Sequence, residues 1–168
     1  DDIDVGMPRK DYERFLKIAQ QELPREYFLQ TYETDAQYPI HFAKMRDSNT
    51  TYMMVNLSNC KINHGLCIDI APLDGKPSII DRIMLSIYKE TLTRYRFVNT
   101  HSKTKTQELL LKYLVSKYSA YEINIKIKKL MIQYDFDCSK YVGNFFGVWR
   151  KREIFPREYF GNGSQLEF

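Results

Sequence analysis

Carboxylates at two places in the chain could together hold a divalent cation. Asp2 and Asp4 lie one residue apart in the opening stretch Asp1-Asp2-Ile3-Asp4-Val5, so on a strand their side chains project from the same face. Asp69 lies in a second, apolar stretch, Leu66-Cys67-Ile68-Asp69-Ile70. Oxygen ligands suit a hard cation such as Mg²⁺ or Mn²⁺, which keeps positions for substrate phosphates. The pattern predicts a metal-dependent phosphoryl-transfer site, with Asp69 on a neighbouring strand.

Each acidic motif also has a plainer interpretation. An Asp-x-Asp at the start of a chain is commonly a solvated terminus, so this motif alone is weak evidence for a metal. Asp69 is more informative, because a carboxylate between apolar residues is either buried at a high energetic cost or points into a site that uses its charge. The two features together leave a metal site and a structural role both open.

Three further residues are candidates for contacts with phosphate. Lys44 and Arg46 are two positions apart on a predicted strand and share one face, and Arg46 could grip phosphate oxygens with its planar fork. The alternative is a pair of solvated charges, or an ion pair with Asp47. His64, just before Gly65, could contact phosphate or act as an acid, whereas the plainer interpretation is a loop histidine without a function.

Length and composition predict one soluble globular domain that covers residues 1–168. Hydrophobic residues make up 43% of the chain and charged residues 27%, and no apolar run approaches the roughly 18 residues of a membrane span. The net charge of +4 is compatible with a solvated surface or with a basic face that attracts nucleotide diphosphates or anionic glycolipids. Cys60, Cys67 and Cys138 show no zinc-site spacing, and their odd number favours reduced thiols in the cytoplasm.

Periodicity in the first half predicts one helix and several strands. An apolar stripe at helical spacing follows Pro8 and ends near Pro24; it consists of Tyr12, Phe15, Leu16, Ala19 and Leu23. Strand patterns are predicted at 27–32, 39–45, 50–55 and 66–71. Gly6 is expected to end the acidic strand, and Pro72 the strand of Asp69, since proline cannot continue a hydrogen-bonded ladder. Asp74 is then expected to be a turn or capping residue.

The second half is predicted to be mainly helical. Capping boxes start helices at Ser78 (with Asp81) and at Ser119 (with Glu122), and a further helix is predicted between about 104 and 118. The first of these helices is expected to bury a stripe made of Ile80, Ile83, Met84, Ile87, Tyr88 and Tyr95. Loops with short strands follow after 135. Strands first and helices later, without regular alternation, predict an α+β fold with a mixed sheet rather than a doubly wound parallel sheet.

Three stretches of the chain resemble motifs of the LicD family, and they occur in the same order along the sequence. They are Asp1-Asp2-Ile3-Asp4-Val5-Gly6-Met7-Pro8-Arg9-Lys10-Asp11-Tyr12, Phe42-Ala43-Lys44-Met45-Arg46-Asp47 and His64-Gly65-Leu66-Cys67-Ile68-Asp69-Ile70-Ala71-Pro72-Leu73-Asp74. LicD proteins are phosphocholine transferases of bacterial surface glycans, related to the fukutin-type ribitol-phosphate transferases. The resemblance implies a nucleotidyltransferase-like fold in which Asp2, Asp4 and Asp69 are catalytic and hold Mg²⁺ or Mn²⁺. It also supports Lys44 and Arg46 as phosphate-binding residues, with His64 as a further candidate from its position alone.

The family resemblance is incomplete at both ends of the chain. Asp2-Ile3-Asp4-Val5 fits the Asp-x-Asp element of the superfamily and Asp69 its third aspartate, but the glycine turn that precedes them in the superfamily is missing. The chain also stops at Phe168, where such proteins usually continue. We therefore expect a fragment that lacks an N-terminal helix with its glycine turn and a C-terminal segment.

The activity implied by the resemblance is the transfer of a phospho-alcohol. A CDP-linked donor such as CDP-choline would give its phosphocholine to a hydroxyl of a cell-surface glycan or glycolipid, and CMP would leave. Such an enzyme is expected in the cytoplasm or at the inner face of the membrane, with a peripheral membrane contact and no nucleic acid partner. Two alternatives remain: a nucleotidyltransferase that releases pyrophosphate, and a non-catalytic domain that binds only a metal or a partner.

Overall fold

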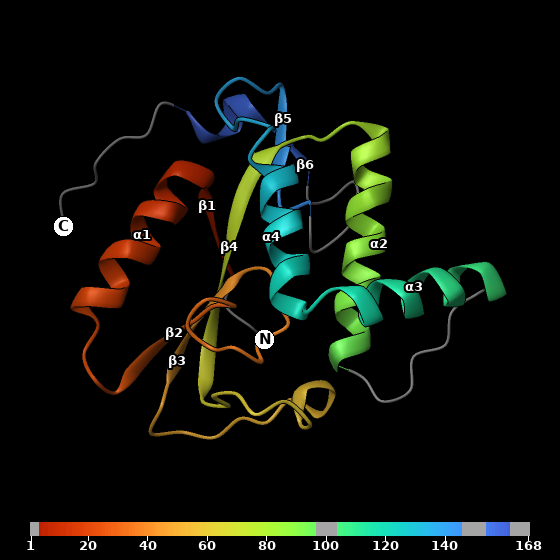
Figure 1. Ribbon diagram of the computed structural model, residues 1–168. Coiled ribbons are helices and arrows are strands. Elements are labelled where there is room, and N and C mark those ends of the chain that lie inside the picture. The colour runs from red at the N-terminus through yellow and green to blue at the C-terminus, as the bar shows by residue number, and fades with distance from the viewer. Residues whose placement is uncertain (1–3, 97–103, 146–153, 162–168) are drawn as a thin grey trace.

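A six-stranded mixed sheet forms the centre of the fold (Figure 1). The computed structural model describes residues 4–96, 104–145 and 154–161. Its strands are β1 (Asp4–Pro8), β2 (Tyr27–Gln30), β3 (Ala43–Asp47), β4 (Leu66–Gly75), β5 (Tyr141–Gly143) and β6 (Ile154–Pro156). The order is β2-β3-β4-β5-β6, and β1 pairs with β4. Because β1 runs parallel to β4 while the other pairs are antiparallel, the predicted α+β fold with a mixed sheet is confirmed.

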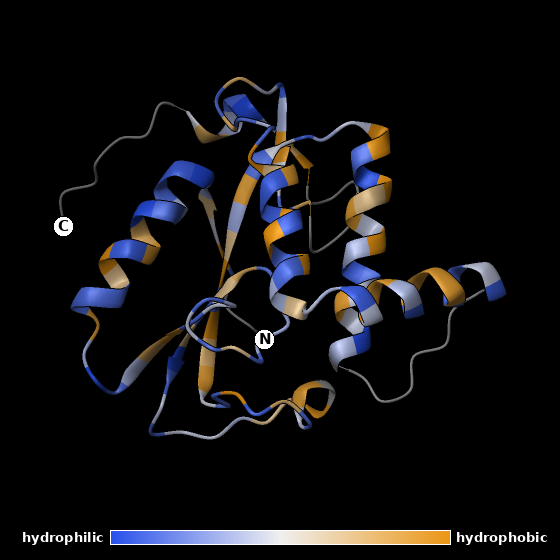
Figure 2. Cartoon of the chain, viewed as in Figure 1, coloured by the Kyte–Doolittle hydropathy of each residue, from blue (hydrophilic) through white to orange (hydrophobic). Residues whose placement is uncertain are grey.

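Helices lie on both sides of β4. They are α1 (Arg9–Glu22), α2 (Ile79–Arg96), α3 (Lys105–Lys117) and α4 (Ala120–Met131), with short 3₁₀ helices at Val55–Leu57 and Arg157–Phe160. Figure 1 shows α1 on one side of β4, and α2 and α4 on the other. Figure 2 shows hydrophobic stretches along β4, and the strand is buried mainly in its second half, from Ile70 to Gly75. No helix among the described residues is long and apolar enough to cross a membrane.

The predicted stripe of α1 builds the first core. Tyr12 and Ala19 are buried there together with Ile70 of β4, and Val5 and Met7 of β1 pack against them. These strand residues alternate with Asp4 and Gly6, so the apolar face of β1 covers the core and the acidic face points away from it. The helix begins directly after Pro8, which suits a position that needs no backbone N–H donor.

The second core lies between α2 and α4. The capping box predicted at Ser119 is present, and at both Ser78 and Ser119 the hydroxyl accepts a hydrogen bond from the backbone N–H three residues on. The stripe expected on α2 is partly wrong, because Ile80 and Ile83 are 74% and 56% exposed. The buried residues of this core are instead Leu85, Leu92, Ile123, Ile127, Met131 and Phe145. The face of α2 that becomes buried is therefore determined by its packing against α4, and not by the periodicity of α2 alone.

Several predicted strand limits are wrong, and the pairing explains why. β1 continues through Gly6 to Pro8, and β4 continues through Pro72 to Gly75. The pairing of β3 with β4 ends at Ile70, before Pro72, so the proline lies outside the hydrogen-bonded ladder of these two strands.

The region between β2 and β4 also differs from its prediction. The strand expected at 39–45 is shifted to Ala43–Asp47, and residues 50–54 form no strand. The backbone N–H of Tyr52 bonds to the carbonyl of His64, 2.6 Å away, within a loop. Tyr52 and Met53 are exposed, so their alternating pattern has no core to cover.

A buried histidine makes the stability of this fold depend on pH. The ring of His41 stacks on Tyr32 with 6.0 Å between the centroids, and burial lowers the pKa of His41 to about 3, although a contact with Asn124 opposes the shift. In the unfolded chain the pKa is near 6.5, so the unfolded state binds more protons below that value. The stabilising contribution is therefore complete above about pH 6.5 and is lost as the pH falls towards 3.

Acidification to pH 5 is expected to lower the free energy of unfolding by about 2 kcal/mol through His41 alone. Urea denaturation of the wild type and of His41→Phe at pH 7 and pH 5 measures this contribution as the difference between the two pH dependences. Tyr32→Phe keeps the stacked ring and should behave like the wild type. An equal pH dependence in His41→Phe and the wild type would contradict the prediction.

Candidate functional site

The structure pairs Asp4 with Asp69 across the parallel strands β1 and β4. Directly paired residues project from the same face, and neighbouring strands lie about 4.8 Å apart. Asp4 is exposed, and the side chain of Asp69 is 24% exposed. Two carboxylates from distant parts of the chain therefore lie side by side on the face of the sheet opposite to α1.

Lys44 extends this acidic pair into a row of three charged residues. It is paired with Asp69 on the other edge of β4, and its ammonium forms an ion pair with Asp69 Oδ1. The Lys44 side chain is only 4% exposed, and its Nζ lies 5.3 Å from the centroid of the Phe42 ring. The order across β3, β4 and β1 is thus a buried cation, a half-buried carboxylate and an exposed carboxylate.

Small residues lie next to the carboxylates on the same face. Gly6 and Ala71 are the pair two positions further along β1 and β4, and Gly6 is exposed. A Cβ at position 6 would lie 3.2 Å from the side chain of Leu73, so a larger residue would crowd this part of the sheet. The absence of a side chain at Gly6 keeps the face beside Asp4 uncovered.

Arg46 lies two residues beyond Lys44 on the same face of β3, and it is 1% exposed. Its guanidinium donates from Nε to Gln30 Oε1 and from Nη1 to the carbonyl of Gly65, at 2.5 Å each. Nη2 is also buried and has no hydrogen-bond partner among the described residues. Arg46 therefore fixes the backbone at Gly65, where the chain enters β4. Its Nη2 group can still donate to a further acceptor.

Substitution of Arg46 by lysine is expected to lower the free energy of unfolding by about 1–3 kcal/mol, because an ammonium cannot reproduce the fork that serves Gln30 and Gly65. If Nη2 also donates to a phosphate, donor binding should weaken as well. Urea denaturation and the dissociation constant of CDP-choline separate these effects. Arg14→Lys on the exposed surface of α1 is the matched control. Lower stability with unchanged donor affinity would leave Arg46 a purely structural role.

His64 does not join the carboxylates. It is half-buried, and its Nε2 lies 3.2 Å from the carbonyl oxygen of Cys60. The strand between Leu66 and Asp69 alone spans about 10 Å, so His64, which lies before the start of β4, is separated from the pair along the strand. The structure thus brings Asp4, Asp69 and Lys44 together, and places Arg46 nearby and His64 apart.

The predicted third ligand, Asp2, lies outside the described residues. Among the residues that are described, no three histidine, cysteine or acidic side chains form a group that could hold a metal ion. Asp4 and Asp69 nevertheless fit a hard cation, because both supply carboxylate oxygens from one face and Asp69 is only half-buried. Two carboxylates would leave coordination positions for phosphate oxygens.

Arg9 and Asp74 form a buried ion pair that was not predicted from the sequence. Arg9 donates from Nε to Asp74 Oδ1 (2.8 Å) and from Nη2 to Oδ2 (2.5 Å), and Asp74 is 2% exposed. Burial raises the pKa of Asp74, and the guanidinium opposes that shift. Asp74 is therefore not a turn or capping residue but joins the start of α1 to the end of β4. Its position between Leu73 and Gly75, in an apolar strand, was the available signal.

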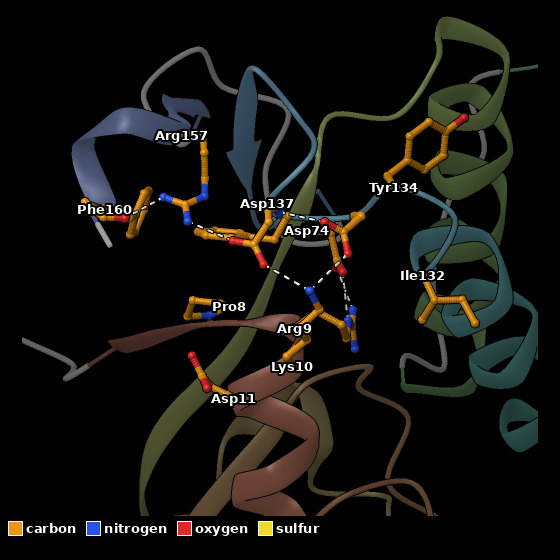
Figure 3. A pocket seen from close by; sticks show the side chains of 13 residues that line it. Pro8, Arg9, Lys10, Asp11, Asp74, Ile132, Tyr134, Asp137, Arg157 and Phe160 are labelled. Carbon is orange, nitrogen blue, oxygen red and sulfur yellow. Dashed lines mark hydrogen bonds and ion pairs between the residues drawn. The ribbon is translucent and has the colours of Figure 1, made fainter. Parts of the chain in front are cut away.

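A cavity of about 280 Å³ lies beside this ion pair, at the end of β1 away from Asp4. Figure 3 shows Lys10 and Arg157 both reaching Asp137 there. Lys10 Nζ is 3.1 Å and Arg157 Nη2 2.8 Å from this carboxylate, and the Arg157 guanidinium lies 4.7 Å from the centroid of the Phe136 ring. These charges satisfy one another, and neither Asp4 nor Asp69 lines the cavity. The acidic pair is therefore the better candidate site.

Comparison with known proteins supports a likeness to LicD proteins. The chain is 27% identical, over 178 residues, to the lipopolysaccharide cholinephosphotransferase LicD of Haemophilus influenzae. The alignment covers the whole of this chain and 65% of the relative, so the chain spans about two thirds of that protein's length. No family model matches the chain, and no solved structure matches it significantly.

Proposed function

We propose that this protein transfers a phospho-alcohol such as phosphocholine from a CDP-linked donor to a hydroxyl of a cell-surface glycan or glycolipid. The observation that carries the proposal is the pairing of Asp4 with Asp69, next to Lys44, in a chain similar over its whole length to a cholinephosphotransferase. A CDP-linked donor would place the reaction in the cytoplasm, and a glycolipid acceptor would bring the protein to the inner face of the membrane.

The carboxylates are proposed to hold Mg²⁺ or Mn²⁺. Asp4 and Asp69 would be ligands on the described part of the sheet, and Asp2 would be the third. When bound, the cation would neutralise charge on the transferred phosphoryl group and on its leaving group. Paired strands hold the two carboxylates more rigidly than loops would, so little reorganisation is needed when a donor binds.

Asp69 is proposed to accept the proton in the transfer step. The acceptor oxygen attacks the distal phosphorus of the donor, its proton passes to Asp69, and the bond from that phosphorus to the bridging oxygen breaks. CMP leaves with the bridging oxygen. The positive charge of Lys44 and the remaining donor of Arg46 are suited to phosphate oxygens. His64 fits this role less well, because it lies before the start of β4 and is separated from Asp69 along the strand.

A nucleotidyltransferase is the second candidate function. The same carboxylate pair would then serve attack on the α-phosphorus of a nucleoside triphosphate, and pyrophosphate would leave. The acidic pair does not distinguish these reactions, since both need a cation beside two phosphoryl groups. The likeness to a cholinephosphotransferase favours the first reaction.

Product analysis tests the proposal. The full-length gene product is incubated with Mn²⁺ and either CDP-choline or cytidine triphosphate, in the presence of a deacylated lipopolysaccharide acceptor and with EDTA as control. Release of CMP that requires both acceptor and Mn²⁺ is the expected result. Pyrophosphate release from the triphosphate would establish the alternative, and a lack of both products would indicate a domain that only binds metal or a partner.

A further inference from the structure

We propose that Lys44 is a displaceable counter-ion of the carboxylate site. It neutralises Asp69 while no divalent cation is bound, and its ammonium turns to the donor phosphates when the cation arrives. This inference rests on the proposed function, because it concerns the same site. It assigns Lys44 a role in coupling cation binding to donor binding, beyond a simple contact with phosphate.

The first support is the position of the ammonium. Lys44 and Asp69 are cross-strand partners, and Asp4 is the partner of Asp69 on its other side. Lys44 contacts Asp69 through Oδ1, the oxygen that also lies 3.7 Å from Cys67 Sγ. A cation shared by Asp4 and Asp69 would therefore bind within a few ångströms of a resident positive charge.

The second support is the burial of Lys44. A lysine with a 4% exposed side chain needs a negative partner, and among the described residues Asp69 forms its only ion pair. The Phe42 ring, 5.3 Å away, adds a weaker contact. When a cation binds the carboxylate of Asp69, the ammonium of Lys44 loses its ion-pair partner. The buried ammonium then needs another anion.

The donor's phosphates would supply that anion. With Asp69 committed to the cation, the ammonium of Lys44 can satisfy its charge on a phosphate oxygen held beside the same cation. Cation and donor should therefore bind with positive coupling, because each relieves the charge left unpaired by the other. Without the donor, Lys44 opposes the cation by like-charge repulsion in a partly desolvated site.

Removal of this charge should change the two affinities in opposite directions. For Lys44→Met without nucleotide, we expect the dissociation constant for Mn²⁺ to fall at least about tenfold, since the repulsion is gone. In saturating Mn²⁺, the dissociation constant for CDP-choline should rise at least about tenfold. Mn²⁺ affinity is read from the electron paramagnetic resonance of free Mn²⁺, and donor affinity from calorimetry. A lysine that only holds the sheet together would weaken both when replaced.

Controls keep the test decisive. Lys44→Arg retains the charge and should bind Mn²⁺ like the wild type, while Asp69→Asn should bind it far more weakly. Lys128→Met removes a lysine that pairs with Glu13 at 3.1 Å, away from the site, and should change neither affinity. If Lys44→Met does not fold, as judged by circular dichroism, Lys44→Gln replaces it, because glutamine can still donate to Asp69.

The outcomes separate the inference from the proposed function. Tighter Mn²⁺ binding by Lys44→Met that requires Asp69 supports the inference, even if the wild type binds Mn²⁺ weakly. Mn²⁺ binding that Asp69→Asn abolishes but Lys44→Met leaves unchanged overturns the inference and leaves the metal site standing. If no variant binds Mn²⁺ in the presence or absence of CDP-choline, the metal site itself fails, and the inference falls with it.

Discussion

Replacement of Asp69 by asparagine is expected to reduce turnover of the full-length protein at least about a hundredfold. Asparagine keeps the size of the side chain and one acceptor oxygen, but it cannot balance a divalent cation or take up a proton. Asp4 would then be the single carboxylate of the described pair. The measurement is the initial rate of CMP release from CDP-choline, together with a thermal melt that checks the fold.

Asp47→Asn is the matched control for this substitution. Asp47 lies at the end of β3, and its Oδ1 accepts a hydrogen bond from the backbone of Asn49 at 2.9 Å, which asparagine can also accept. Its activity should equal that of the wild type. An Asp69→Asn variant that retains more than about a tenth of the wild-type rate would make Asp69 a structural residue. Lys44 would then be its structural partner, and the proposed chemistry would lose its centre.

Loss of the Arg9–Asp74 ion pair is expected to have the largest effect on stability. Asp74→Asn leaves the largely buried guanidinium of Arg9 with only its longer ion pair to Glu13, at 3.4 Å, which should lower the free energy of unfolding by about 3 kcal/mol or more. Urea denaturation at pH 7 measures the change. The double variant Arg9→Met/Asp74→Leu removes both charges and should be less destabilised than the single variant, since no charge remains buried and unpaired.

Lys10→Met provides the contrast to this variant. Its ammonium contacts Asp137 at 3.1 Å, but its side chain is 71% exposed. Solvent screens such a pair, so we expect little change in stability. Equal destabilisation in Lys10→Met and Asp74→Asn would show that burial does not determine how much these ion pairs contribute to the free energy of unfolding. A double variant as unstable as Asp74→Asn would show that packing, rather than charge, determines the loss.

The sequence by itself determined the features that depend on neighbours a few residues away. The hydroxyls of Ser78 and Ser119 cap the starts of α2 and α4, and the stripe around Tyr12 forms the buried face of α1. Alternation along β1 predicted that Val5 faces a core and Asp4 faces away from it, and this is the observed arrangement. Side-chain spacing and local hydrogen bonds decide these features, and both can be read within one turn or strand.

Only the tertiary structure decided which distant residues meet. The register of β1, β3 and β4 places Asp4 and Lys44 on either side of Asp69, whereas a shift of one residue would turn each of these side chains to the other face. Periodicity also could not reveal that Arg9 reaches Asp74, nor that the pairing of β3 with β4 ends at Ile70, before Pro72. The types of the site residues are local properties of the chain, but their assembly depends on strand order, edge occupancy and burial, which arise only when the whole sheet has formed.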